Sequence, residues 1–287
     1  MSHKKLIVLL LTVILISEAT IITIQPFSIE KKIKPKAVLD KFVLKAKPPG
    51  TPGNGGNGGG NSGGDDTGSG GGVEITGQKY AVVIGISDYE GTNNDLNYAD
   101  DDAIDWANYL ESIGYTVYLL LDREATAQAI EDAINWLISV VDEPGDGVVF
   151  AYSGHGYYDR TYGSMIISTD MVGITQGYLD SAFSYLESQH VFFFFDACQI
   201  GGMEVLADEE VGRYVAMASN ERSYSYDGTS DMQNGFFTYY FLEDAIKTKG
   251  YQYMEDAFDY TVAVLKKILP QMKPTEADTY DGGLSLT

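Results

Sequence analysis

A histidine and a cysteine, each placed directly after an apolar run, are the residues of this chain best suited to perform chemistry. His155 lies in the segment Ser153-Gly154-His155-Gly156, and Cys198 lies in Asp196-Ala197-Cys198, 43 positions further along. An imidazole can take the proton of a thiol, and the resulting thiolate is a strong nucleophile. The pair therefore predicts nucleophilic catalysis, with Cys198 as nucleophile and His155 as general base or acid.

Cys198 is the only cysteine among the 287 residues, so it cannot form a disulfide within the chain. A single thiol is most often buried filler, and otherwise it forms an intermolecular bridge or is reactive. Glycines flank His155, and Gly201 and Gly202 follow the cysteine, where they allow a tight turn and close approach of a substrate to the backbone. These neighbours favour a reactive thiol.

The elements expected to position the pair follow from the apolar pattern, which alternates between strand-like and helix-like segments. Strands are expected at 80–86, 115–121, 148–152, 191–195 and 215–218, with a short one at 165–168. Helices are expected at 103–113, 125–141, 176–186, 237–248 and 254–269. Strands separated by helices predict an α/β fold with a mostly parallel sheet and helices on both faces. His155 and Cys198 would then follow the carboxyl ends of two strands, where such sheets bind ligands, and they would meet at one edge if these two strands are neighbours.

The first 76 residues differ in composition from the rest. Residues 1–24 begin with basic side chains and continue into an apolar run that is shorter than the roughly 20 residues of a membrane-spanning helix. This segment predicts a signal peptide, with an uncleaved signal anchor as the alternative, and hence a secreted or cell-surface protein. Residues 25–48 form a lysine-rich pro-segment and 49–76 a flexible Gly-rich linker, which leaves 77–287 as the folded domain.

The net charge is −22, and nine lysines up to residue 48 make the remainder even more acidic, at about −28. An acidic surface repels nucleic acid, so nucleic acid is not expected as a partner, whereas basic polypeptides and divalent cations are attracted. A membrane partner is expected only if the signal segment is retained. The segment 222–231, which mixes tyrosine, serine and acid, is expected to form a loop on the substrate side.

The motifs around His155 and Cys198 resemble those of the caspase-like cysteine peptidases, especially the metacaspase and clostripain-like branches. The resemblance covers about residues 78–287 and extends to segments 80–86 and 96–103. It implies a three-layer sandwich around a mostly parallel sheet. It also implies a dyad that hydrolyses peptide bonds through a thioester on the cysteine.

By the same resemblance, the backbone N–H groups of Gly156 and Cys198 would stabilise the oxyanion. Asp196 stands two residues before the cysteine, where the caspase signature has glutamine. Together with Asp102 it would place carboxylates in the first specificity pocket, which selects Arg or Lys. The alternatives are a structural hydrogen-bonding role for Asp196 and a helix N-cap role for Asp102.

The chemistry itself requires no cofactor, but several members of the family need Ca²⁺, which binds clustered carboxylates. Asp170 and Asp208 are the candidate ligands in this sequence. Two other functions remain open. One is a catalytically silent binding module, and the other is a transpeptidase or ligase that uses the same thioester.

Overall fold

The computed structural model describes residues 74–208 and 210–287. The predicted signal segment, the lysine-rich segment and nearly all of the Gly-rich segment lie outside the described residues. Within the described part, no helix is long and apolar enough to cross a membrane.

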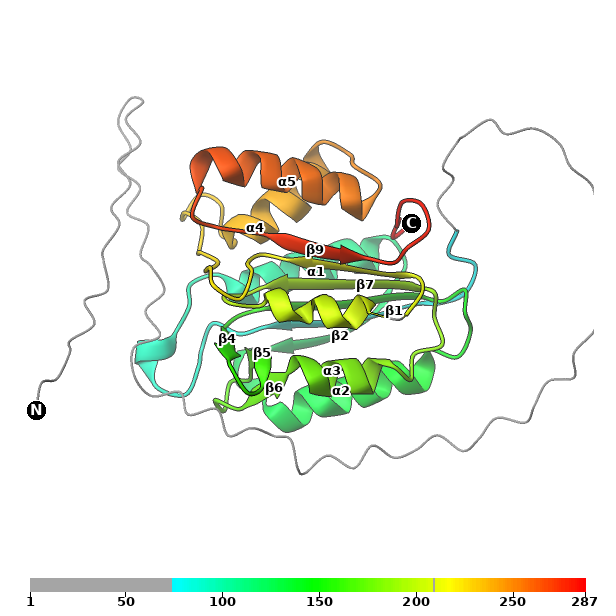
Figure 1. The fold of residues 1–287 in the computed structure, drawn as a ribbon, viewed down its shortest axis with the longest axis horizontal. Helices are drawn as coiled ribbons and strands as arrows, with labels where there is room; N and C mark the ends of the chain where they lie inside the picture. The colour runs from blue at the N-terminus through cyan, green and yellow to red at the C-terminus, as the bar shows by residue number, and fades with distance from the viewer. Residues whose placement is uncertain (1–73, 209) are drawn as a thin grey trace, which may run out of the picture.

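A six-stranded sheet forms the centre of the domain (Figure 1). Its spatial order is β2 (Thr116–Leu121), β1 (Lys79–Gly85), β3 (Gly147–Ser153), β7 (His190–Asp196), β8 (Arg213–Met217) and β9 (Thr275–Asp278). The first five strands are parallel, and β9 pairs antiparallel with β8 at one edge. Strands β3 and β7 are neighbours, as the positions of His155 and Cys198 require.

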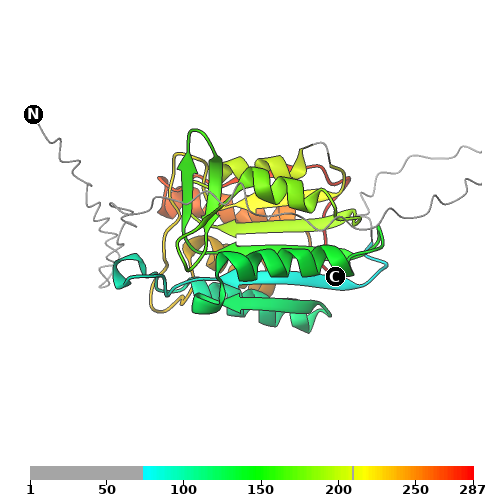
Figure 2. The same ribbon diagram turned by 90° about the horizontal axis from the view of Figure 1, so that it is seen from below.

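Helices cover both faces of this sheet, so the predicted three-layer α/β architecture is confirmed (Figures 1 and 2). One face carries α1 (Ala99–Ser112), α4 (Phe236–Thr238), the π-helical η4 (Tyr239–Thr248) and α5 (Met254–Ile268). The other carries α2 (Ala127–Val140), α3 (Gln176–Phe183) and the 3₁₀ helix η3 (Gly201–Ala207). Short 3₁₀ turns, η1 (Thr92–Asn94) and η2 (Asp122–Glu124), follow β1 and β2.

The fully buried strand β7 supplies side chains to both cores, because successive residues of a strand point to opposite faces. Phe192 and Phe194 pack against Trp106 of α1, with ring centroids 5.9 and 4.9 Å away. Phe193 packs at 5.0 Å against Phe183 of α3 on the other face. An unbroken apolar strand is therefore what a sheet covered on both sides needs.

A second, three-stranded sheet lies beyond the carboxyl ends of the parallel strands (Figure 2). It consists of β4 (Gly156–Asp159), β5 (Gly163–Ile167) and β6 (Gly173–Thr175). The expected strand at 165–168 corresponds to β5. Its two partners have only four and three residues, too few for a periodic pattern.

Two differences from the sequence-based expectations affect the site. Helix α1 begins at Ala99 rather than at residue 103, so Asp102 lies inside its first turn. Strand β9 was not expected, because it is polar and alternates between half-buried and exposed positions at the sheet edge.

Candidate active site

The segments that carry His155 and Cys198 leave the sheet side by side. The last residues of β3 and β7, Ser153 and Asp196, are paired in register, and the Gly154 N–H donates to the Asp196 carbonyl at 3.1 Å. Gly156 then approaches the backbone of Cys198 so closely that a Cβ at this position would collide with the Cys198 carbonyl oxygen. The sheet therefore brings the two predicted catalytic segments to one edge.

Two tyrosines hold the backbone of His155. The Tyr89 hydroxyl accepts a hydrogen bond from the His155 N–H at 2.7 Å, and the Tyr152 hydroxyl donates to the His155 carbonyl at 2.8 Å. The Tyr89 ring also packs against the imidazole, with centroids 4.3 Å apart. All three side chains are buried, so these contacts fix the position of the histidine.

The Asn94 carbonyl determines which nitrogen of the imidazole carries the proton. It lies 2.7 Å from Nε2 of His155. A carbonyl oxygen only accepts hydrogen bonds, so Nε2 is the protonated nitrogen and Nδ1 is the basic one. Burial lowers the pKa of His155 to about 3, although the bond to Asn94 opposes the shift. The imidazole is therefore neutral at physiological pH and able to accept a proton.

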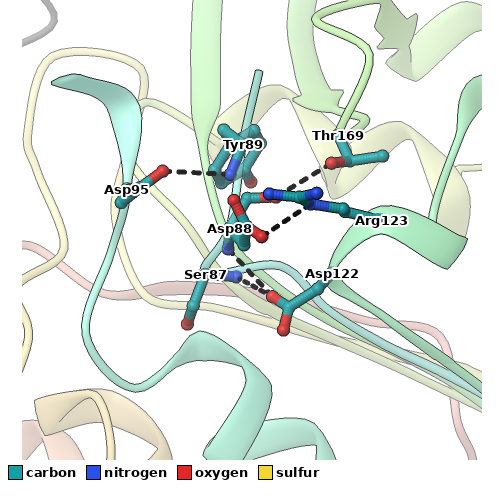
Figure 3. Close-up of polar contacts among 7 residues, drawn as sticks. All are labelled: Ser87, Asp88, Tyr89, Asp95, Asp122, Arg123 and Thr169. Atoms are coloured by element: carbon teal, nitrogen blue, oxygen red, sulfur yellow. Dashed lines mark hydrogen bonds and ion pairs between the residues drawn. The ribbon is translucent and has the colours of Figure 1, made fainter. Parts of the chain in front are cut away.

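Both Tyr89 and Asn94 belong to the β1–α1 loop (residues 86–98), which a polar network holds in place (Figure 3). The Asp122 carboxylate accepts from the backbone N–H groups of Ser87 at 2.8 Å and Asp88 at 2.9 Å. Further contacts in the network are Arg123 Nε to Asp88 Oδ2 at 2.8 Å, Thr169 Oγ1 to the Asp88 carbonyl at 2.9 Å, and the Tyr89 N–H to Asp95 Oδ1 at 3.2 Å. The loop that orients the imidazole is thus anchored to the turns after β2 and β5.

The Cys198 thiol is buried, with 4% of the residue exposed, and lies 3.6 Å from the Ser225 carbonyl oxygen, to which it donates. Burial raises the pKa of the thiol to about 12, with smaller contributions from the charges of Asp196 and Asp227. In this state the cysteine and the histidine are therefore both neutral. Nucleophilic attack would require transfer of the thiol proton as the substrate binds.

A small pocket of about 30 Å³ adjoins Cys198. Three carboxylates line it: Asp102 from α1, Asp196 from the end of β7 and Asp227 from the segment between β8 and α4, which we call the 220–235 loop. No lysine or arginine is among the described residues that line the pocket. The pocket is accordingly suited to a cationic group.

Asp102 and Asp196 are both deeply buried and hydrogen-bonded. Asp102 accepts from the Ser153 hydroxyl at 2.6 Å and from the Gly235 N–H at 2.9 Å. Asp196 accepts from the N–H and the hydroxyl of Thr238 at 3.0 and 2.9 Å, and from the Ser225 hydroxyl. The Cα of Gly235 lies against both carboxylates, so a side chain there would clash with them.

Burial raises the pKa of both carboxyl groups, and the charge of Asp196 raises that of Asp102 further. Two carboxylates that share one buried site repel each other, and a cation placed between them relieves this repulsion. The N-cap alternative for Asp102 is wrong, because the N-cap position of α1 is Tyr98 and the Asp102 carboxylate binds groups outside its own helix.

Several residues of the site were not singled out from the sequence. Asp227 lies in the segment expected to be a substrate-side loop, but nothing distinguished it there from its acidic neighbours. Tyr89 and Asn94 act through contacts between distant segments, for which a single sequence contains no signal. Tyr152 lies only three residues before His155, but in the sequence it is one more residue of an apolar strand.

The two candidate Ca²⁺ ligands have separate surroundings. The Asp170 carboxylate accepts from the Ala127 N–H at 2.9 Å, at the first residue of α2, and from the Ser168 hydroxyl at 2.6 Å. Asp208 is exposed at the end of η3. Across residues 74–208 and 210–287, no group of three or more His, Cys, Asp or Glu side chains is arranged to hold a metal ion. Ca²⁺ binding therefore stays a prediction from the resemblance.

Comparison with known proteins identifies related sequences and folds. Residues 78–277 match the family described as the caspase domain. Metacaspase-1 of Mycosarcoma maydis and Metacaspase-1 of Debaryomyces hansenii are each 34% identical to this chain, over 91 and 90 residues. These matches cover 29% and 28% of this chain but only 22% and 20% of the relatives, so the aligned part is about a fifth of their length. A solved structure from Geobacter sulfurreducens has a TM-score of 0.58 and 17% identity over 70% of this chain and 92% of that one, which shows a shared fold.

Proposed function

Because the chain belongs to the caspase domain family of cysteine peptidases, we propose that it is an exported endopeptidase that cleaves after Arg or Lys with a His155–Cys198 dyad. The observation that carries the specificity is the pocket beside Cys198, which three carboxylates and no described cationic side chain line. A carboxylate pocket binds a guanidinium or ammonium group and disfavours an acidic side chain.

In the acylation step, Nδ1 of His155 takes the thiol proton and Cys198 Sγ attacks the carbonyl carbon of the scissile bond. The carbonyl π electrons move onto the oxygen, and the N–H groups of Gly156 and Cys198 stabilise this oxyanion. When the intermediate collapses, the C–N bond breaks and the imidazolium gives its proton to the leaving amine. The acyl group remains on Cys198 as a thioester.

In the deacylation step, His155 takes a proton from water, and the hydroxide oxygen attacks the thioester carbonyl. The C–S bond then breaks, the product acid leaves, and the proton returns to the sulfur. The bond from Nε2 to the Asn94 carbonyl supports both steps, because it keeps Nδ1 as the nitrogen that exchanges protons.

A panel of reporter peptides that differ only in the residue before the leaving group tests this function. We expect cleavage after Arg and Lys, no cleavage after Asp, and loss of activity in Cys198→Ala and His155→Ala. Activity confined to the Asp peptide would refute the specificity. A thiol-directed peptide warhead that fails to label Cys198 would instead support a silent binding module.

Export, self-processing and Ca²⁺ dependence belong to the same proposal. We propose that residues 1–24 direct export and that the enzyme removes the lysine-rich segment 25–48 itself, since lysines are the side chains its pocket prefers. If Cys198→Ala yields the same mature N-terminus as the wild type, self-processing is wrong. Running the peptide panel with and without Ca²⁺ tests the metal dependence.

A further inference from the structure

The carboxylate of Asp227 differs from those of Asp102 and Asp196 in its partners. All four carboxylate oxygens of Asp102 and Asp196 accept hydrogen bonds from the surrounding chain. Of the Asp227 oxygens, only Oδ2 accepts bonds from described residues, and both come from Asn97, at 2.7 Å from Nδ2 and 3.3 Å from the backbone N–H. Among the three carboxylates of the pocket, that of Asp227 therefore has the most hydrogen-bonding capacity left for an incoming cation.

Backbone pairing within the 220–235 loop fixes the position of Asp227, which lines the pocket. Asp227 forms an isolated antiparallel bridge with Gly235, the residue whose N–H binds Asp102. The bonds from Gly228 N–H to the Asn234 carbonyl and from Phe236 N–H to the Tyr226 carbonyl continue this pairing. The position of Asp227 is thus fixed relative to Asp102 by backbone contacts.

Asn97 belongs to the β1–α1 loop and follows Leu96, which lines the pocket. Asn97 is exposed, whereas Asp227 is half-buried, and their hydrogen bonds join the β1–α1 loop to the 220–235 loop. A cationic side chain that binds Oδ2 of Asp227 must therefore displace Asn97 from this oxygen or share the oxygen with it.

From these contacts we infer that Asp227 receives the cationic group of the substrate and that Asn97 occupies it in the empty enzyme as a neutral, displaceable partner. The Asn97 amide donates its N–H to the same carboxylate that a guanidinium would bind. An arriving Arg side chain replaces a hydrogen bond from a neutral donor by an ion pair, in which both partners are charged and the guanidinium can donate two parallel bonds. A substrate without a cationic group gains only another bond from a neutral donor, so the contact between Asn97 and Asp227 contributes to selectivity. This inference rests on the proposed function.

The test compares two reporter peptides that differ only in having Arg or its neutral analogue citrulline before the leaving group. In Asp227→Asn, we expect kcat/KM for the Arg peptide to fall about 10- to 100-fold, the range for loss of a charged hydrogen-bond partner, with little change for citrulline. Asp231→Asn is the matched control, since it removes the same charge from an exposed position of the same loop that does not line the pocket.

Asn97→Ala provides an independent arm. Removal of the competing donor should raise kcat/KM for the Arg peptide about 2- to 10-fold through a lower KM, because more of the enzyme is ready to bind. The same substitution should have no effect in the Asp227→Asn background. Thermal unfolding midpoints establish that each variant is folded.

The outcomes separate the inference from the proposed function. If the wild type shows no preference for Arg over citrulline, both fail. If the wild type prefers Arg and Asp227→Asn keeps that preference, the inference alone is refuted. A fall in kcat/KM for the Arg peptide in Asn97→Ala would also refute it, because the asparagine would then support the site and not occupy it.

Discussion

The resting state of Cys198 leads to a prediction about its chemical reactivity as a function of pH. Its thiol pKa is raised to about 12. At pH 7.5 about one thiol in 30,000 would then be ionised, compared with about one in ten for an ordinary cysteine with a pKa of about 8.5. A more basic thiolate is also more nucleophilic: the logarithm of its rate constant rises by about 0.4–0.5 for each unit of thiol pKa. Over the difference between the two pKa values, this raises the reactivity of the ionised form roughly 40-fold. Alkylation should therefore be about 100-fold slower than that of a free cysteine.

Iodoacetamide modification followed by mass spectrometry measures this rate without ambiguity, because the chain contains one cysteine. In the folded protein, the rate should rise tenfold per pH unit from pH 6 to pH 10 without a plateau. It should show no inflection near pH 6.5, since the pKa of His155 is lowered to about 3 and the imidazole stays neutral throughout. The urea-unfolded protein is the control and should react as an ordinary cysteine.

A constant rate between pH 6 and pH 9 would refute this reasoning, because it would mean that a thiolate is already paired with an imidazolium in the empty enzyme. A second expectation follows from the charges near the sulfur. The charges of Asp196 and Asp227 raise the thiol pKa, so Asp227→Asn should quicken alkylation, provided that its unfolding midpoint is unchanged.

Three further predictions concern the supporting structure. Tyr89→Phe leaves the buried N–H of His155 without its acceptor, which costs about 1–3 kcal/mol, so kcat for the Arg peptide should fall about 5- to 100-fold while KM changes little. A rise in KM as large as the fall in kcat would contradict a role of Tyr89 in positioning His155. Arg213→Met removes the buried guanidinium that donates to two backbone carbonyls, so the free energy of unfolding measured in urea should fall by about 2–4 kcal/mol. A fall of less than about 1 kcal/mol would mean that those carbonyls find other hydrogen-bond donors. Burial raises the pKa of Glu255 to about 7, so its contribution to stability is present below about pH 4.3 and is lost as the pH rises through 7. Because this side chain is only partly buried, the free energy of unfolding of Glu255→Gln should rise by about 1–2 kcal/mol relative to that of the wild type between pH 4 and pH 8. A difference in unfolding free energy that does not change with pH would contradict the raised pKa of Glu255.

The order of secondary structure elements was predictable from local pattern. A strand buried on both faces, such as β7, is a continuous apolar run, and an amphipathic helix repeats its apolar residues at helical spacing. The elements that were missed lack these signals. Strands β4 and β6 are too short for a period, and β9 is a polar edge strand. The start of α1 was placed four residues late, because its first turn is rich in Asp and not in apolar residues.

The sequence by itself determined the chemistry available to this protein: one thiol, one histidine after a neighbouring strand, and an acidic residue two positions before the cysteine. These features are local, and a parallel sheet necessarily brings the carboxyl ends of adjacent strands together. The protonation state and the position of the site residues were decided only by the tertiary structure. The protonation of His155 depends on a carbonyl 61 residues away, and the third carboxylate of the pocket comes from a loop whose place is fixed by contacts to α1 and to the β1–α1 loop. Hydrogen bonding and burial act over a few ångströms in space regardless of separation along the chain, so they become visible only when the chain is folded.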